Sequence, residues 1–245
     1  MFEHTVVVSG AASGLGHAVM RRLAAKGARV AAVDVANIHA TDLPDECTAH
    51  ACDVTDAKAV QDVIDRIGPI SALVTCAGIA PGAKLVGKSG PHDADLFAKV
   101  MAVNVMGTFH LMSTCAAAMQ RNAPNDKGQR GVIVTTSSVA AFEGQIGQIA
   151  YAASKGAVAA MTLPAARELA RDGIRVASIA PGVFDTPMMQ AMPEEVQTSI
   201  GATIPFPPRL GDPDDFAALV EHILTNTTLN GEVIRLDGAL RMAAK

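Results

Sequence analysis

Aromatic residues are scarce in this sequence, which has no Trp, one Tyr and seven Phe among its 245 residues. Hydrophobic residues nevertheless make up 49% of the chain and charged residues only 18%, a balance that excludes an intrinsically disordered protein. The core must therefore consist of Ala, Val, Ile, Leu and Met side chains, as is typical of parallel strands covered on both faces. The length fits a single domain over residues 1–245.

A concentration of positive charge is also lacking. The net charge is −4 and no run of Lys or Arg occurs, which argues against nucleic acid or an anionic membrane as partner. No uninterrupted apolar run is long enough to span a bilayer, so we expect no membrane association. The few residues before the first expected strand leave no room for a signal or transit peptide, and we expect a cytoplasmic protein.

Cysteine and histidine spacing indicates neither a disulfide framework nor a metal site. The four cysteines contain no CxxC pair, and the seven histidines form no pair at metal-ligand spacing. We therefore expect reduced thiols at Cys47, Cys52, Cys76 and Cys115, and no metal.

Short β-branched runs alternate with stretches of helical periodicity along the whole chain. Strands are expected at 5–9, 29–34, 48–51, 71–75, 131–136, 174–180 and 232–236, and helices at 15–26, 56–66, 104–121, 151–171 and 212–224. This alternation predicts a single-domain α/β fold, a Rossmann-type doubly wound parallel sheet with helices on both faces. In such sheets ligands bind at the carboxyl ends of the strands.

A glycine-rich loop joins the first expected strand to the first helix. Gly10, Gly14 and Gly16 allow the backbone to turn sharply and approach a pyrophosphate, and the helix N-terminus supplies free N–H groups. Asp34 ends the second strand, where a carboxylate can bind the ribose hydroxyls of NAD and repel the 2′-phosphate of NADP. The loop position before Ser13 is Ala12 and not an arginine that could bind the 2′-phosphate, so NAD is the expected cofactor. The alternative is a solvated aspartate at a strand end.

Asp53 ends the third expected strand, where the adenine of a dinucleotide could lie. An aspartate that caps the helix at 56–66 is an almost equally good interpretation.

Tyr151 and Lys155 are spaced i, i+4, which places both side chains on one face of a helix. A phenol has a pKa of about 10, and a cation one turn away favours its phenolate form. Ser138 lies just past the strand at 131–136, where its hydroxyl can hold a substrate oxygen. Tyr151 would then accept the proton of a substrate alcohol while the hydride passes to nicotinamide. A YxxxK spacing occurs by chance on many helices. Here Tyr151 is the only tyrosine in the chain, and its place at this spacing favours a catalytic role.

Further motifs complete a set that covers nearly the whole chain. In chain order they are SGAASGLG at 9–16, Asp34, Cys76-Ala77-Gly78, Asn104, Ser138, Tyr151 with Lys155, and Pro181-Gly182. This set resembles the motifs of the short-chain dehydrogenase/reductase family.

The resemblance implies that Ser138, Tyr151 and Lys155 are the catalytic triad and that Asn104 holds a water in a proton relay behind Lys155. It also implies that the segment after Pro181-Gly182 faces the nicotinamide. The implied cofactor-binding residues are Gly10, Ser13, Gly14, Leu15, Gly16, Asp34, Asp53, Val54, Cys76, Ala77, Gly78, Tyr151, Lys155, Pro181, Gly182, Val183, Phe184 and Thr186. One departure is Cys76, where the family usually has an Asn whose amide hydrogen bonds this thiol cannot replace.

Within the family, segments 128–133, 140–145, 204–207 and 229–239 resemble the type 2 3-hydroxyacyl-CoA dehydrogenases, a group that also has a Cys-Ala-Gly turn. The resemblance implies NAD-dependent interconversion of (S)-3-hydroxyacyl-CoA and 3-oxoacyl-CoA in fatty acid metabolism. The alternatives are a hydroxysteroid or other secondary-alcohol dehydrogenase, or a 3-oxoacyl carrier-protein reductase, which Asp34 disfavours because that enzyme uses NADPH. A scaffold subunit is a further alternative, and it would tolerate loss of Tyr151.

The surroundings of the site suggest how a substrate is held. We expect residues 185–208 to form a substrate lid with an adaptable, methionine-rich wall. Gln148, with Ser138 and Tyr151, is a candidate substrate-binding residue that can bond a thioester carbonyl. Lys84 and Lys88 can meet coenzyme A phosphates. Relatives in the family form homotetramers through helices equivalent to 104–121 and 151–171, and the resemblance implies the same here.

Overall fold

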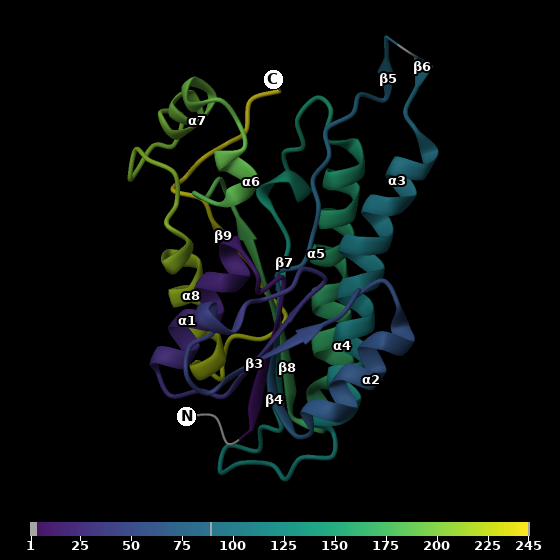
Figure 1. The fold of residues 1–245 in the computed structure, drawn as a ribbon, viewed down its shortest axis with the longest axis vertical. Coiled ribbons are helices and arrows are strands. Elements are labelled where there is room, and N and C mark those ends of the chain that lie inside the picture. The colour runs from purple at the N-terminus through teal and green to yellow at the C-terminus, as the bar shows by residue number, and fades with distance from the viewer. Residues whose placement is uncertain (1–3, 89, 245) are drawn as a thin grey trace.

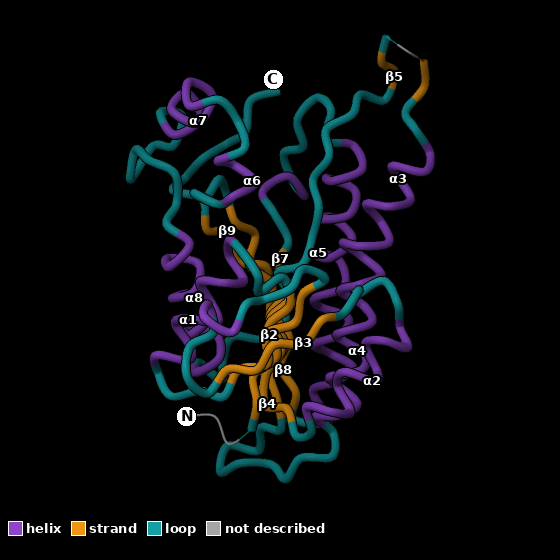
Figure 2. The backbone as a smooth tube through the Cα atoms, viewed as in Figure 1, coloured by secondary structure: helices purple, strands orange, loops and turns teal. Residues whose placement is uncertain are grey.

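The computed structural model describes residues 4–88 and 90–244, which form a three-layer α/β fold (Figure 1). Seven parallel strands make the central sheet in the order β3-β2-β1-β4-β7-β8-β9. Figure 2 shows these strands enclosed between two groups of helices. The strands are β1 Thr5–Ser9, β2 Val30–Asp34, β3 Cys47–Ala51, β4 Ile70–Thr75, β7 Gly131–Thr136, β8 Ile174–Pro181 and β9 Val233–Leu236.

Each face of the sheet has its own aliphatic core, as the composition predicts. On one face α1 (Gly14–Ala25) and α8 (Pro213–Thr225) pack Met20 and Phe216 against strand residues such as Val6. On the other face α2 (Ala57–Ile67), α4 (Gly107–Met119) and α5 (Ile149–Leu169) cover the sheet. The alternation of side chains along a strand sends neighbours such as Val6 and Val7 to opposite cores. The predicted doubly wound fold is confirmed.

The predicted strands and helices agree with the structure to within two residues at each end, with one exception. The helix expected at 104–121 begins ten residues earlier, as α3 (Ala94–Met101), and continues through a π-helical turn at Ala102–Met106 into α4. Asp93 starts it, because its carboxylate accepts a hydrogen bond from the N–H of Asp95. The predicted start of the helix at residue 104 is therefore wrong.

Two smaller features were not predicted. Within residues 185–208 the chain forms α6 (Pro187–Gln190) and α7 (Glu194–Gly201), which lie above the carboxyl ends of the strands in Figure 1. Residues 81–95 contain a short antiparallel hairpin, β5 (Val86–Gly87) with β6 (Gly90–Pro91), which projects at the same end of the molecule. Both features therefore border the edge of the sheet where a ligand is expected.

One continuous helical segment, Ala94–Met119, is long and apolar enough to cross a bilayer by length and composition. This is weak evidence for a membrane span, because core helices of soluble proteins pass the same test. The α4 part packs against α2, β4 and β7, and α3 packs against α5. The hydropathy of the segment is accounted for by its place in the second core.

Candidate active site

The glycine loop is shaped by close backbone contacts. Gly10 has φ +67°, and a Cβ there would lie 2.6 Å from the backbone nitrogen of Ala77, while a Cβ on Gly16 would collide with the carbonyl of Gly10. Only glycine fits either position. Ser13 is the extended N-cap of α1 and its side chain makes no cap bond, which leaves the helix N-terminus open for a phosphate.

Asp34 is fixed at the edge of this loop. Its two carboxylate oxygens accept hydrogen bonds from the backbone N–H groups of Ala12 (3.0 Å) and Ala36 (2.9 Å). A carboxylate offers about four acceptor positions, so capacity remains for the hydroxyls of a ribose. The loop thus orients the side chain that is expected to select the cofactor.

Asp53 is held by its own turn. It lies two residues beyond the end of β3, and its carboxylate accepts bonds from both the N–H and the hydroxyl of Thr55, which hold its pKa below the usual value. The alternative that Asp53 caps the following helix is wrong, because Asp56 accepts the N–H bonds of the first turn of α2. Val54 is buried, and a Cβ on Gly107 would collide with it.

Asn104 is fully buried in the π-helical turn, a kind of irregularity that often marks functional sites. Its amide donates to the carbonyl of Ile79 and the hydroxyl of Ser154, both at 2.9 Å, and its oxygen accepts from the N–H of Ile79 at 2.8 Å. The side chain therefore ties the turn after β4 to α5. Its two donors are both used, so a relay water would have to bind at the main-chain carbonyl, which already accepts from Thr108.

Lys155 is a buried cation beside this turn. Its Nζ donates to the carbonyl of Thr136 at 2.7 Å and lies 3.6 Å from where a Cβ on Gly78 would be. Burial lowers the pKa of Lys155 from 10.5 to about 8. An ammonium has three donors, and within the described chain only this one hydrogen bond is seen for them. The remaining donors fit the hydroxyls of a nicotinamide ribose.

Tyr151 and Ser138 meet through their hydroxyls. Burial raises the pKa of Tyr151 above 10, and its hydrogen bond to Ser138 offsets this in part. The expectation that Lys155 sets the state of the phenol is not met without cofactor: its Nζ lies 5.8 Å from the ring centroid, and desolvation dominates. Ser138 also accepts the N–H of Ala140 at 3.1 Å, which fixes its hydroxyl.

The segment after β8 faces the glycine loop. A Cβ on Gly14 would lie 3.4 Å from the methyl carbon of Thr186, and the N–H of Gly182 donates to the carbonyl of Leu236. Phe184 does not face the nicotinamide as expected. Its ring is buried edge-on against Phe216 in the first core, so only its backbone can border the cofactor.

Gln148 lies apart from the catalytic hydroxyls. Its side-chain oxygen accepts the N–H of Gln145 at 3.1 Å, and it lines a cavity of about 650 Å³ together with Lys84 and Ala153. Tyr151 and Ser138 do not line this cavity, and α5 contributes Ala152 and Ala153 to it instead. The cavity is therefore a neighbour of the reaction site and not the reaction site itself.

The donor set along this edge of the sheet fits a dinucleotide. Among the described residues, no group of three or more His, Cys, Asp or Glu can hold a metal ion. Three groups lie along the carboxyl edge of the sheet. The open N-terminus of α1 fits the pyrophosphate, the fixed carboxylate of Asp34 fits the adenosine ribose, and the ammonium of Lys155 fits the nicotinamide ribose.

Comparison with known proteins agrees with this arrangement. The family model for short chain dehydrogenases matches residues 4–197. The chain belongs to the short-chain dehydrogenase family. It is 49% identical to the 3-hydroxyacyl-CoA dehydrogenase type-2 of Drosophila melanogaster over 96% of both chains. It is thus an oxidoreductase.

Two solved structures extend the comparison. The 3-hydroxyacyl-CoA dehydrogenase type-2 from Mycobacterium avium superposes with a TM-score of 0.91, at 38% identity and over 100% of this chain and 98% of the other. ElxO with NADP bound gives a TM-score of 0.85 at 25% identity, over 97% and 98%. The family cofactor of this dehydrogenase is a nicotinamide dinucleotide.

Some residues that build the site were not predicted from the sequence. Ser137 donates to the carbonyl of Lys155 at 2.9 Å, and Ser154 donates to the carbonyl of Tyr151 at 2.7 Å. Both hydroxyls fix the backbone of the catalytic helix. Their place next to Ser138 and Lys155 was the only sequence signal, and serines at such positions are too common to single out.

Proposed function

We propose that this dehydrogenase oxidises the 3-hydroxyl of (S)-3-hydroxyacyl-CoA to a ketone with NAD as cofactor. The observation that carries the reaction is the buried Lys155, bonded to the carbonyl of Thr136, with its Nζ 5.8 Å from the ring centroid of Tyr151 on the same helix face. The substrate class rests on the similarity to the type-2 relatives. In this proposal the enzyme serves fatty acid metabolism in the cytoplasm.

The proposed catalytic residues divide the work. Ser138 holds the reacting oxygen, Tyr151 accepts its proton, and Lys155 provides positive charge below the phenol and donors for a ribose. Asn104 positions Gly78 and Lys155, and a relay water at its main-chain carbonyl would carry the proton onward. The nicotinamide, when bound, supplies the hydride acceptor.

The remaining site residues are proposed as follows. Gly10, Ser13, Gly14, Leu15 and Gly16 hold the pyrophosphate. Asp34 binds the adenosine ribose, and the adenine lies near Asp53 and Val54. The nicotinamide end is bordered by Cys76, Ala77, Gly78, Pro181, Gly182, Val183, the backbone of Phe184 and Thr186. Residues 185–208 act as the lid of this single domain, and Gln148 contributes from the rim of the neighbouring cavity.

Asp34→Ala is expected to weaken NAD binding and narrow the preference for NAD over NADP. The substitution removes the ribose acceptor and the repulsion of a 2′-phosphate, and either change is worth about tenfold or more in affinity. Dissociation constants for both cofactors, measured by fluorescence of the reduced forms, test this. A parent enzyme that already uses NADP as well as NAD would show that Asp34 has another role.

A CoA ester is expected to be a far better substrate than the free acid. We expect kcat/KM for (S)-3-hydroxybutyryl-CoA to exceed that for 3-hydroxybutyrate by about 10²-fold or more, because remote contacts with CoA contribute binding energy to the transition state. NADH formation with both compounds, the (R)-ester, a hydroxysteroid and a simple secondary alcohol gives the comparison.

Two exposed lysines provide the control for this experiment. Replacing Lys84 and Lys88 with Ala should raise KM for the CoA ester and leave KM for the simple alcohol unchanged, since only the ester carries phosphates. Equal kcat/KM for the ester and the free acid would instead favour a hydroxysteroid or general secondary-alcohol dehydrogenase.

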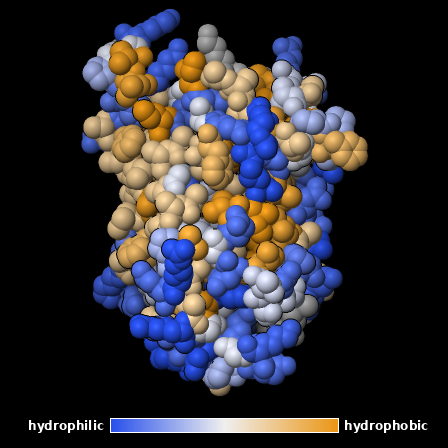
Figure 3. Space-filling model, turned by 180° about the vertical axis from the view of Figure 1, so that it is seen from behind, coloured by the Kyte–Doolittle hydropathy of each residue, from blue (hydrophilic) through white to orange (hydrophobic). Residues whose placement is uncertain are grey.

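The proposed assembly is a homotetramer. Exposed hydrophobic residues lie on the π-helical turn (Met106), on α4 (Phe109) and on α5 (Ile149, Leu163), and Figure 3 shows a broad hydrophobic patch across the middle of the back face. Monomers seldom expose large apolar patches. Light scattering at micromolar concentration measures the mass, and a monomer would contradict the proposal.

A further inference from the structure

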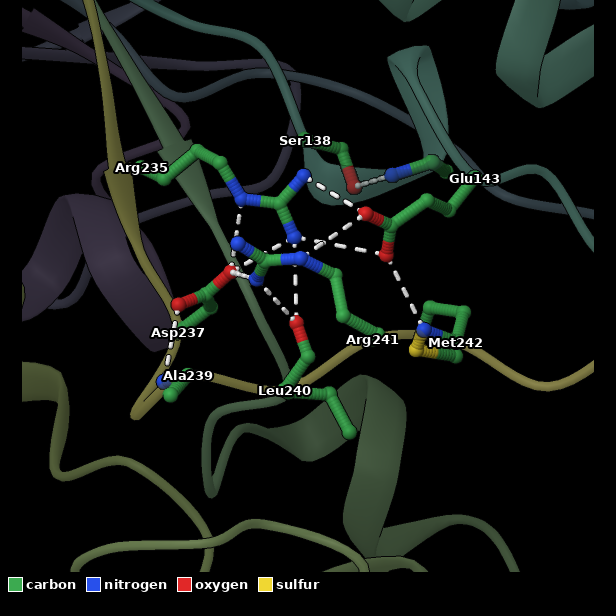
Figure 4. A network of polar contacts seen from close by, with 9 residues as sticks. Ser138, Glu143, Arg235, Asp237, Ala239, Leu240, Arg241 and Met242 are labelled. Atoms are coloured by element: carbon green, nitrogen blue, oxygen red, sulfur yellow. Dashed lines mark hydrogen bonds and ion pairs between the residues drawn. The ribbon is translucent and has the colours of Figure 1, made fainter.

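An ion-pair cluster joins the loop of the catalytic serine to the end of the chain. Glu143 lies in the loop between Ser138 and α5, Arg235 lies in β9, and Asp237 and Arg241 follow that strand. Figure 4 shows the four charged side chains meeting one another, with Ser138 above them in that view. We call Glu143, Arg235, Asp237 and Arg241 together the loop clamp.

Arg235 is the centre of the loop clamp. Its guanidinium donates to Glu143 at 2.9 and 3.3 Å, to Asp237 at 2.8 Å and to the carbonyl of Leu240 at 3.1 Å. It also lies 5.6 Å from the centroid of the ring of Phe142, the residue before Glu143. Phe142 and Glu143, neighbours in the loop between Ser138 and α5, therefore both contact one guanidinium. Its planar set of donors fixes their orientation.

The other end of the loop clamp reaches the cofactor side. Asp237 is 8% exposed, and a Cβ on Gly182 would lie 2.8 Å from its Cβ, so this carboxylate is packed against the turn that follows β8. A Cβ on Gly238 would lie 2.6 Å from Ile204 at the base of the lid. The cluster thus contacts the loop that follows Ser138 and the turn after β8, and the residue after Asp237 packs against Ile204 at the base of the lid.

The tail of the chain secures the same loop. The carboxylate of Glu143 accepts the N–H of Met242 at 3.0 Å, and the N–H of Ile146 donates to the carbonyl of Ala244 at 3.0 Å. Between these contacts and Ser138, the loop makes a short 3-10 turn at Val139–Ala141. The N–H of Glu143 then donates to the carbonyl of Val139. A displacement of Glu143 is therefore passed directly to the residues around Ser138.

We infer that the loop clamp is a positioning device for the dehydrogenase reaction: Glu143 and Arg235 set the hydroxyl of Ser138 against Tyr151 and the nicotinamide segment. None of its members reaches the reacting atoms. A loss of alignment of about 1 Å at a reacting group can lower turnover by about 10²-fold, so a shift of Ser138 on loss of the clamp has a measurable effect. The inference holds for any secondary alcohol that the site accepts.

Glu143→Gln tests the inference. The variant keeps the shape and one acceptor but loses the charge, and we expect kcat to fall about tenfold or more while the Kd for NAD changes less than about threefold. In a Ser138→Ala background the same substitution should have almost no further effect on kcat, because its action passes through that hydroxyl. Arg235→Lys keeps the positive charge but loses the planar guanidinium. Its kcat should lie between those of the parent and Glu143→Gln.

A matched control and a direct readout separate positioning from general destabilisation. Glu221 forms a comparable half-buried pair with Arg22 between α8 and α1, far from the loop, so Glu221→Gln should lose similar stability and keep kcat. Tyr151 is the only tyrosine, and its ultraviolet titration should shift to higher pH in Glu143→Gln as the bond from Ser138 weakens, but not in Glu221→Gln.

Equal losses of kcat in the two Gln variants, an unchanged Tyr151 titration, or a full additional loss in the Ser138→Ala background would each overturn the inference. None of these outcomes depends on which substrate is used, and the titration needs no substrate at all. A failure of the proposed acyl-CoA specificity would leave all of them unaltered.

Discussion

Replacing Tyr151 with Phe is expected to lower kcat by about 10²–10⁴-fold, the range associated with loss of a group that transfers a proton. The substitution removes one hydroxyl and nothing else. The ring keeps its place 5.8 Å from Nζ of Lys155, and Lys155 keeps its bond to the carbonyl of Thr136. The cofactor site is therefore intact, and NAD binding should change by less than about threefold.

The sequence makes this experiment unusually direct. With no Trp and a single Tyr, ultraviolet titration of the parent reports Tyr151 alone. Because burial raises its pKa, we expect the phenol of the cofactor-free protein to ionise above pH 10, and to ionise at lower pH once NAD supplies a positive charge nearby. Turnover of Tyr151→Phe within about threefold of the parent would remove Tyr151 from the mechanism and favour a scaffold role.

Local signals predicted the fold and the main elements of the site. Gly10, Gly14 and Gly16 mark the loop because close backbone approach demands glycine, and Tyr151 and Lys155 mark one helix face because the helical period fixes it. Both signals depend on residues close together in the chain, which is why they can be read from the sequence.

The parts of the site that the sequence could not predict depend on packing between distant segments. Phe184 was assigned to the nicotinamide, but it packs on Phe216, 32 residues later in the chain. Asn104 was expected to hold a water, but its side chain is occupied by Ile79 and Ser154. Contacts over such separations leave no periodicity in the sequence.

The loop clamp illustrates the same limit. Glu143 and Arg235 are 92 residues apart, and the neighbouring places of β7, β8 and β9 in the sheet bring them together. Nothing in either local sequence marks them as partners. Charged residues at strand ends are usually solvated, so the pair could be recognised only in the folded molecule.

Lys155→Met is expected to give an enzyme that is less active but more stable at neutral pH. Nζ is buried, and its pKa of about 8 against 10.5 corresponds to a penalty of about 3 kcal/mol for keeping the charge inside the fold. Met fills a similar volume without charge. Losing the bond to the carbonyl of Thr136 offsets about 1 kcal/mol, so we expect a net gain of about 1–2 kcal/mol at pH 7.

The dependence on pH tests the cause of that gain. Below pH 8 Lys155 is charged in both the folded and the unfolded chain, so the parent carries the full burial penalty. Between pH 8 and 10.5 the folded state has lost its proton and the unfolded state still binds one, so the stability of the parent rises with pH relative to the variant. Urea unfolding of both proteins at pH 7 and pH 10 should therefore show the advantage of the variant shrinking.

Activity should move in the opposite direction to stability. Removing the cation takes away the donors proposed for the ribose and the charge below the phenol, so we expect kcat to fall about 10²–10³-fold and KM for NAD to rise. Activity gained at the expense of stability is common where a functional group destabilises the folded state. A variant that is less stable than the parent at pH 7 would mean that the ammonium has favourable partners beyond Thr136, and an active one would exclude Lys155 from catalysis.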